Sequence, residues 1–217
     1  MELKGKKINF LGDSITEGVG TSGYPYRYFD LIAGRCGAVC RGYGISGTRI
    51  AIQRTPSDPP SFDLYFSSRV DGMDADADAV VVFGGTNDFG HGDAPFGTMD
   101  DRTPETFMGG LHDLCSRLIN RYPGKLIVLC TPMHRLGEES KWGERKDAAA
   151  GSLLDYVRGI RQVAEYYGIP VLDLFANSGI QPAVELQREL FMPDGLHPND
   201  AGHELLANQM IRFLERC

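Results

Sequence analysis

Several kinds of partner are excluded by what this sequence lacks. It carries 22 basic against 29 acidic residues, a formal net charge of −7, and its lysines and arginines are scattered rather than gathered in a stripe. Phosphate backbones and anionic membrane surfaces bind concentrated positive charge, so we expect neither nucleic acid nor a membrane surface as a partner. No apolar run is long enough to cross a bilayer, so we expect no membrane insertion either.

Cysteine is scarce, and its spacing gives no sign of a metal site. The five cysteines are an odd number without the paired spacing of a metal site. Cys115 and Cys130 lie in apolar helix and strand patterns, which predicts buried free thiols.

The start of the chain shows no apolar signal core with a small-residue cleavage site. We therefore expect a cytoplasmic protein, while a signal removed from the sequence stays open.

The histidines and one acidic run also lack the spacing of metal ligands. The remaining candidates besides His197 are His91, His112, His134 and His203. None has a partner at metal-ligand spacing, so we expect no metal and no cofactor. His112 and His203 lie in helix patterns, where surface or capping positions are expected. The run from Asp74 to Asp78 imitates a calcium loop, but alanine stands where its sixth position needs glycine.

Alternating strand and helix patterns make up the rest of the chain. The apolar runs predict strands at residues 7–11, 38–43, 79–83, 125–130 and 169–175. Helices are predicted at 24–36, 103–118, 153–167 and at the end of the chain, with a short one at 62–70. Residues 89–102, and 136–145 around Trp142, are expected as loops. This alternation predicts an α/β fold, a parallel five-stranded sheet between two helical layers. No break in composition interrupts it, so residues 1–217 are expected to form a single domain.

Three polar or glycine-rich segments follow the first three predicted strands. Ser14 follows the first strand, Gly47 the second and Asn87 the third. Ligands of open parallel sheets bind at the carboxyl ends of the strands. We therefore expect these three residues on one rim of the sheet.

The residue types on this rim are those that cleave an ester. That reaction needs a nucleophile, a base, a group that orients the base, and donors for an oxyanion. Asp194 lies three residues before His197, close enough in a turn to reach its Nδ1 and leave Nε2 for Ser14. The backbone N–H groups of Ser14 and Gly47 and the amide of Asn87 are candidate oxyanion donors. The serine lies at the first strand without the Gly-x-Ser-x-Gly elbow of α/β-hydrolases, so that fold does not fit.

Four segments resemble, in order, the sequence blocks of the SGNH (GDSL) hydrolase family. They span residues 12 to 197 and read Gly12-Asp13-Ser14-Ile15, Ile45-Ser46-Gly47-Thr48, Gly85-Thr86-Asn87-Asp88 and Asp194-Gly195-Leu196-His197. The resemblance implies a flavodoxin-like three-layer fold. It also implies Ser14 as nucleophile and first oxyanion donor, Gly47 and Asn87 as the other donors, His197 as base and Asp194 as its partner.

The expected function is that of a serine esterase which forms an acyl-enzyme. We expect short-acyl, particularly acetyl, esters as substrates, with carbohydrate esters among them, because such substrates are common in the family and no long apolar lid is present. Hydrolysis of lysophospholipids or thioesters is the alternative within the enzyme class. A non-catalytic flavodoxin-like module with a phosphate or flavin at the first loop is the alternative outside it. Asp13 and Glu17 would repel that phosphate, and the module leaves Asp194 and His197 without a role.

Overall fold

A five-stranded parallel sheet forms the centre of the molecule in a computed structural model, which describes residues 1–140 and 151–217. The strand order is β2-β1-β3-β4-β5. The bounds are β1 Lys7–Gly12, β2 Val39–Gly44, β3 Ala79–Phe83, β4 Leu126–Cys130 and β5 Val171–Leu172. Gly12 is in register with both Gly44 and Phe83, and Phe83 with Cys130, so the first four strands end at one level.

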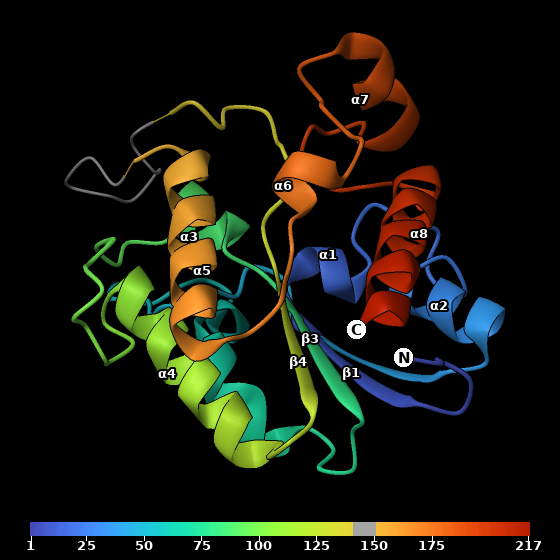
Figure 1. Cartoon of the computed structure of the whole chain (residues 1–217). Helices are drawn as coiled ribbons and strands as arrows, with labels where there is room; N and C mark the ends of the chain where they lie inside the picture. Colours follow the sequence, from blue (N-terminus) through green and yellow to red (C-terminus); the bar gives the residue numbers. More distant parts are fainter. Residues whose placement is uncertain (141–150) are drawn as a thin grey trace.

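Helices cover both faces of this sheet (Figure 1). One face packs on α4 (Phe107–Arg121) and α5 (Leu153–Tyr167), and the other on α2 (Tyr28–Cys36) and α8 (Asp200–Arg216). Within β3, Val80 and Val82 belong to the first core, whereas Val81 belongs to the second. Burial on both faces explains why this strand is a continuous apolar run. The predicted α/β fold of three layers is confirmed.

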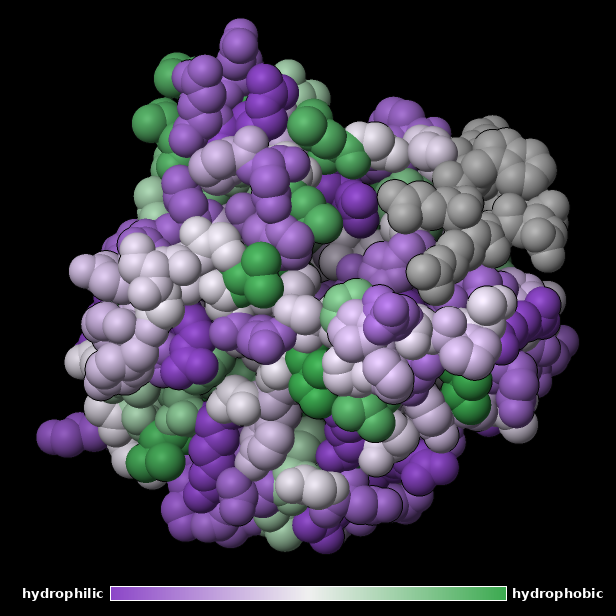
Figure 2. All heavy atoms as spheres, turned by 180° about the vertical axis from the view of Figure 1, so that it is seen from behind, coloured by the Kyte–Doolittle hydropathy of each residue, from purple (hydrophilic) through white to green (hydrophobic). Residues whose placement is uncertain are grey.

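Shorter elements lie between these layers and around the sheet. They are α1 Ser14–Glu17, the 3₁₀ helices η1 Pro60–Asp63 and η2 Phe66–Gly72, α3 Thr86–Gly90, α6 Leu174–Asn177 and α7 Glu185–Phe191. The last of these, α7, protrudes from the body (Figure 1). Seen from behind, hydrophilic side chains cover most of the surface and hydrophobic ones are scattered among them (Figure 2). Among the described helices, none has the length and apolar character needed to cross a membrane.

Three predicted element boundaries are wrong, each because of a local hydrogen bond. The helix expected from Tyr24 begins at Tyr28, since the N–H of Tyr26 closes a turn onto the Gly23 carbonyl. The helix expected from residue 103 begins at Phe107, because the Thr106 side chain caps it by accepting the Gly109 N–H at 3.1 Å. The fifth strand stops at Leu172, because Asp173 caps the short helix that follows.

Of the remaining predictions about helices, loops, cysteines and histidines, some are confirmed and others are wrong. Residues 62–70 form parts of two 3₁₀ helices instead of one helix, and α3 includes the first two residues of the loop expected at 89–102. Cys115 and Cys130 are buried free thiols, as predicted. The two helical histidines, His112 and His203, are buried and not at the surface. The loop predicted at 136–145 is confirmed as far as residue 140, and its remainder, with Trp142, lies outside the described residues.

Candidate active site

The serine of the first motif lies at the start of a short helix. β1 ends at Gly12, and Asp13 caps α1 by accepting the Ile15 N–H at 3.1 Å. Burial raises the pKa of Asp13 to about 7, against the opposing effects of that hydrogen bond and the charge of Arg69. Ser14 is the first residue of α1, a position whose N–H has no partner within the helix. That N–H is therefore suited to bind an anion at the rim.

Ser14, His197 and Asp194 form a continuous chain of hydrogen bonds. The Ser14 Oγ lies 3.0 Å from His197 Nε2, and His197 Nδ1 lies 2.7 Å from Asp194 Oδ2. The other carboxylate oxygen accepts the N–H groups of Leu196 and His197 at 2.8 and 2.7 Å. Partial burial disfavours the charge of Asp194, but the hydrogen bonds from His197 and Leu196 hold its pKa below the ordinary value. An ionised carboxylate at Nδ1 leaves Nε2 to accept the serine proton.

Two neighbouring loops hold the turn that carries His197. Gly20 adopts a φ of +94°, and a Cβ there would lie 2.5 Å from the Pro198 carbonyl, so only glycine lets this loop pack against the turn. On the other side, Leu136 donates its N–H to the Gly195 carbonyl at 2.9 Å. The turn between Asp194 and His197 is thus fixed from both sides.

Gly47 and Asn87 lie in segments that contact each other. The Asn87 amide nitrogen donates to the Thr48 carbonyl at 3.0 Å, and a primary amide carries a second N–H for another acceptor. Gly47 has a φ of +71°, and a Cβ there would lie 2.3 Å from the Phe62 ring. A side chain at this position would therefore displace the loop whose N–H is the candidate donor.

The topology brings these segments beside the serine. β2 and β3 both pair with β1, and the Ile45 N–H donates to the Gly12 carbonyl at 3.2 Å. Arg69 links the same segments, donating to the Gly12 carbonyl at 3.1 Å and to the Thr48 hydroxyl at 3.1 Å. All five residues singled out from the sequence therefore belong to segments that meet at one rim.

Three further residues act at this rim without having been identified from the sequence as part of the site. Arg69 lies in η2, outside the four motifs, so the sequence contained no signal for it. Asp88 is the last residue of the third motif and Glu17 follows the first motif by two residues, and their carboxylates accept backbone N–H groups of the Gly47 segment. Their position in or beside a motif was the only available signal.

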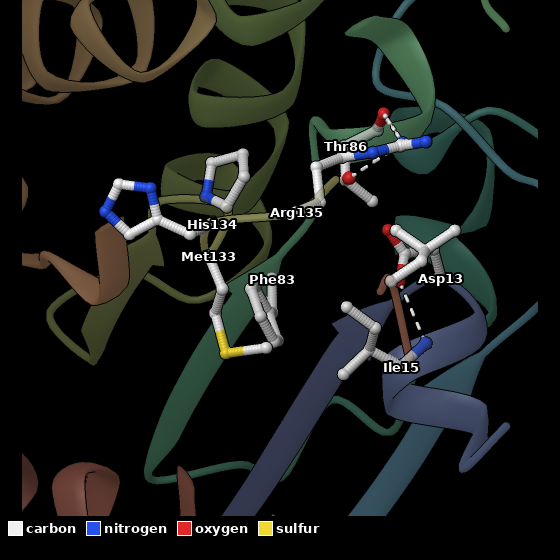
Figure 3. Close-up of a pocket in the computed structure, with 10 residues that line it drawn as sticks. Asp13, Ile15, Phe83, Thr86, Met133, His134 and Arg135 are labelled. Carbon is white, nitrogen blue, oxygen red and sulfur yellow. Dashed lines mark hydrogen bonds between the residues drawn. The ribbon is translucent and has the colours of Figure 1, made fainter. Parts of the chain in front are cut away.

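A small pocket lies between the motif segments (Figure 3). Its lining includes Asp13, Ile15, Thr86 and Leu196, each next to one of the residues described above, and its volume is about 10 Å³. Figure 3 shows Arg135 reaching Thr86, to whose carbonyl it donates at 3.3 Å.

Two further histidines, His134 and His91, follow β4 and α3. His134 lies in the pocket lining, with its Nδ1 2.9 Å from the Glu138 carboxylate, and His91 lies 3.1 Å from an Arg49 nitrogen. Over residues 1–140 and 151–217, no cluster of three or more His, Cys, Asp and Glu is arranged to hold a metal ion.

Comparisons with known proteins identify the family of this chain. The model of the GDSL-like lipase/acylhydrolase family matches residues 10–205. One solved structure is 32% identical, covers 100% of this chain and 99% of its own, and has a TM-score of 0.87. A protein from Lactobacillus plantarum is 29% identical over 98% of both chains, with a TM-score of 0.83.

More distant structures share the fold alone. An acetyl xylan esterase is 22% identical over 96% of this chain and 99% of its own, with a TM-score of 0.65. No curated protein matches the chain. The family match covers nearly the whole sequence and all four motifs, and it gives no support to a non-catalytic module. This protein is a carboxylic ester hydrolase and belongs to the GDSL-like lipase/acylhydrolase family.

Proposed function

We propose that the protein is a serine esterase that cleaves short-acyl esters through an acyl-enzyme. The observation that carries the proposal is the chain of hydrogen bonds from Ser14 through His197 to Asp194, at 3.0 and 2.7 Å. Ser14 Oγ attacks the ester carbonyl as His197 Nε2 takes its proton. The oxyanion accepts hydrogen bonds from the Ser14 N–H, the Gly47 N–H and the Asn87 amide.

The second half of the reaction uses the same groups in reverse order. His197 returns the proton to the leaving alcohol, and the acyl group stays on Ser14 Oγ. A water molecule then loses a proton to Nε2 and attacks the acyl-enzyme. Nε2 passes that proton to Ser14 Oγ as the bond to the acyl group breaks, which releases the carboxylic acid and restores the serine. Asp194 stays ionised throughout and stabilises the imidazolium, consistent with its lowered pKa.

A short acyl group is favoured by the sequence, which carries no long apolar lid that could cover an extended acyl chain. The fold is shared with a structure described as an acetyl xylan esterase, which supports an acetylated carbohydrate as the substrate class. We therefore place acetyl esters first.

One observation favours the alternative of a lysophospholipid or another long-chain substrate. Val184, Leu186 and Leu190 of the α7 region are half or more exposed. This region directly precedes the turn with Asp194 and His197. An apolar chain on the substrate would gain free energy by covering these side chains.

A substrate panel separates the two. We expect kcat/KM to be highest for p-nitrophenyl acetate and to fall at least about tenfold for the octanoate ester, since the sequence carries no long apolar lid to cover the longer acyl chain. Acetylated xylose and xylan oligomers test the alcohol side. Acetyl-CoA and octanoyl-CoA test thioesterase activity.

A matched variant tests the alternative directly. Replacing both Leu186 and Leu190 by serine is expected to leave p-nitrophenyl acetate hydrolysis within about twofold, because both side chains are at least half exposed and a short acyl group would not cover them. A wild type that prefers octanoate, together with loss of that preference in this double variant, would establish the long-chain alternative.

A further inference from the structure

The loop that carries Gly47 is held by carboxylates from two other segments of the rim. Glu17, three residues after Ser14, accepts the Ser46 N–H at 2.7 Å and also the Ser46 hydroxyl. Asp88, next to Asn87, accepts the Ile50 N–H at 2.9 Å with one oxygen and the Ala51 N–H at 2.9 Å with the other. Each carboxylate therefore belongs to a segment that contributes an oxyanion donor, and each binds the segment of the third donor.

These contacts lie on both sides of Gly47. The one from Glu17 is to the residue directly before it, and those from Asp88 are to residues three and four positions after it. Between them, the Thr48 carbonyl accepts the Asn87 amide at 3.0 Å. Hydrogen bonds to an ionised acceptor are about twice as strong as neutral ones. The loop is consequently fixed relative to both Ser14 and Asn87.

Burial makes the Asp88 contact the stronger of the two. Its side chain is buried, whereas Glu17 is exposed. A carboxylate that loses water is costly unless its oxygens are satisfied, and both Asp88 oxygens accept N–H groups of the loop. Helix α3 does not account for this carboxylate, since its N-cap is Gly85 and no side chain caps it.

We propose that Asp88 and Glu17 are positioning residues that set where the Gly47 N–H lies relative to the Ser14 N–H and the Asn87 amide. This rests on the function proposed above, because it concerns the same oxyanion. Donors stabilise an oxyanion only when they lie about 2.7–3.1 Å from the place it will occupy, and a displacement of about 1 Å costs on the order of 10²-fold in rate. The two carboxylates act on the transition state through Gly47 and do not touch the substrate.

The chain offers a matched control in Asp93. Its two oxygens accept the N–H groups of Arg54 and Thr55, each at 2.7 Å. The contact has the same chemistry as that of Asp88 and holds the next part of the same segment, further from Gly47. Asp93 is less buried than Asp88, so a purely structural role predicts that any loss of kcat at either position follows the loss of thermal stability there.

The experiment compares Asp88→Asn, Glu17→Gln and Asp93→Asn with the wild type. Three quantities are measured: kcat and KM for p-nitrophenyl acetate, the inhibition constant of phenylboronic acid, and the thermal midpoint. The boronic acid binds a serine nucleophile as a tetrahedral adduct and so reports on the donors without turnover. KM equals the dissociation constant of the substrate when chemistry is slower than substrate release.

We expect Asp88→Asn to lower kcat by about 10²-fold with KM within about threefold, and to weaken phenylboronic acid binding by about tenfold or more. For Glu17→Gln we expect a loss of kcat of about tenfold, since an exposed contact holds the loop less firmly. Asp93→Asn is expected to keep both kcat and the inhibition constant within about threefold, even where its thermal midpoint falls.

Equal losses of kcat in Asp88→Asn and Asp93→Asn would overturn the proposal, as would a loss confined to KM or to the thermal midpoint. Should Asp88→Asn not fold, Glu17→Gln decides: unchanged kcat and boronic acid binding there overturn the proposal. A failure of the proposed function looks different, because wild-type kcat would then survive the replacement of Ser14 by alanine.

Discussion

The two sides of the rim differ in how they are held. On one side lie Ser14 and Asn87, which are 6% and 4% exposed and follow the central strands β1 and β3. On the other side lies the turn with Asp194 and His197, whose side chains are 54% and 18% exposed. The first side is built by packing of distant segments, and the second largely by hydrogen bonds within four residues.

This difference follows from what each side is proposed to do. Donors stabilise developing charge best when they are fixed beforehand where water is excluded, which requires segments from three strands to be packed together. A base exchanges one proton with its neighbour while the carboxylate orients it, and a short turn fixes that geometry locally. The exposed side therefore tolerates solvent, whereas the buried side depends on the sheet and on carboxylates such as Asp88.

Removing the residue that joins both sides has the largest expected effect. Ser14→Ala deletes the only oxygen that contacts His197 Nε2 among the described residues. Hydrolysis of p-nitrophenyl acetate should fall by more than about 10⁴-fold, to the background left by binding and the remaining donors. The thermal midpoint should stay close to that of the wild type, since one hydroxyl is lost. Turnover like that of the wild type would refute the nucleophile assignment.

The second-largest loss of kcat is expected when a donor on the buried side is removed. Asn87→Ala removes an amide that donates to Thr48 and, in our proposal, to the oxyanion. We expect kcat to fall about 10²–10³-fold with little change in KM, because that contact matters most in the transition state.

The control for this variant is Asn177→Ala. Its amide also donates to a backbone carbonyl, that of Asp173, but in α6. This control should keep kcat within about twofold. An effect of Asn87→Ala seen only in KM would count against the oxyanion role.

Removing the carboxylate on the exposed side should lower kcat by a smaller factor. Asp194→Ala removes the partner of His197 Nδ1, but more than half of that carboxylate is exposed, so water can take its place. A buried carboxylate in this role contributes about 10⁴-fold to kcat. Because the pair here is exposed, we expect kcat to fall only about 10–10²-fold, which is less than the effect of Asn87→Ala. A steady-state comparison of both variants on one substrate checks the order. The reverse order would show that the acid–base turn, and not the buried donors, carries more of the catalysis.

The smallest expected effect is on stability and not on turnover, and it comes from the buried side chain of His203. His203 accepts the Tyr28 N–H at Nδ1, and burial lowers its pKa to about 4, with Asp200 opposing and His197 reinforcing the shift. The unfolded chain takes up this proton near pH 6.5, whereas the folded protein does so near pH 4. The contribution of His203 to stability is therefore complete above pH 6.5 and is lost as the pH falls to 4.

Urea unfolding of the wild type and of His203→Gln checks this contribution. The difference in their free energies of unfolding should change by about 3 kcal/mol between pH 7 and pH 4, at about 1.4 kcal/mol for each unit of pH. Using the difference cancels Asp13, whose pKa of about 7 gives stability the opposite slope over much of this range. A difference that does not depend on pH would show that His203 titrates normally.

The sequence predicted the centre of the fold and the motif segments better than the periphery. Apolar runs such as Ala79–Phe83 identify buried strands because both faces are covered. Short elements cannot be predicted in this way. β5 has two residues and α7 buries none of its side chains, so neither shows a hydrophobic pattern of its own.

Contacts between distant segments could not be predicted from the sequence. The pairing of Asp88 with Ile50 and Ala51 spans nearly forty residues and depends on how β2 and β3 flank β1. The burial of His203 likewise depends on α8 packing against α2, where its ring stacks on Tyr28. The Ser14, Asp194 and His197 contacts were predictable because the motifs name their members, although nothing in the spacing of Ser14 and His197 fixes their distance.

The most direct test of the account is labelling with a fluorophosphonate followed by peptide mass spectrometry. We predict a single adduct on the peptide that contains Ser14 and none in Ser14→Ala, with slower labelling in His197→Ala because the base is lost. An adduct on any other residue, or equal labelling of the wild type and Ser14→Ala, would contradict the account.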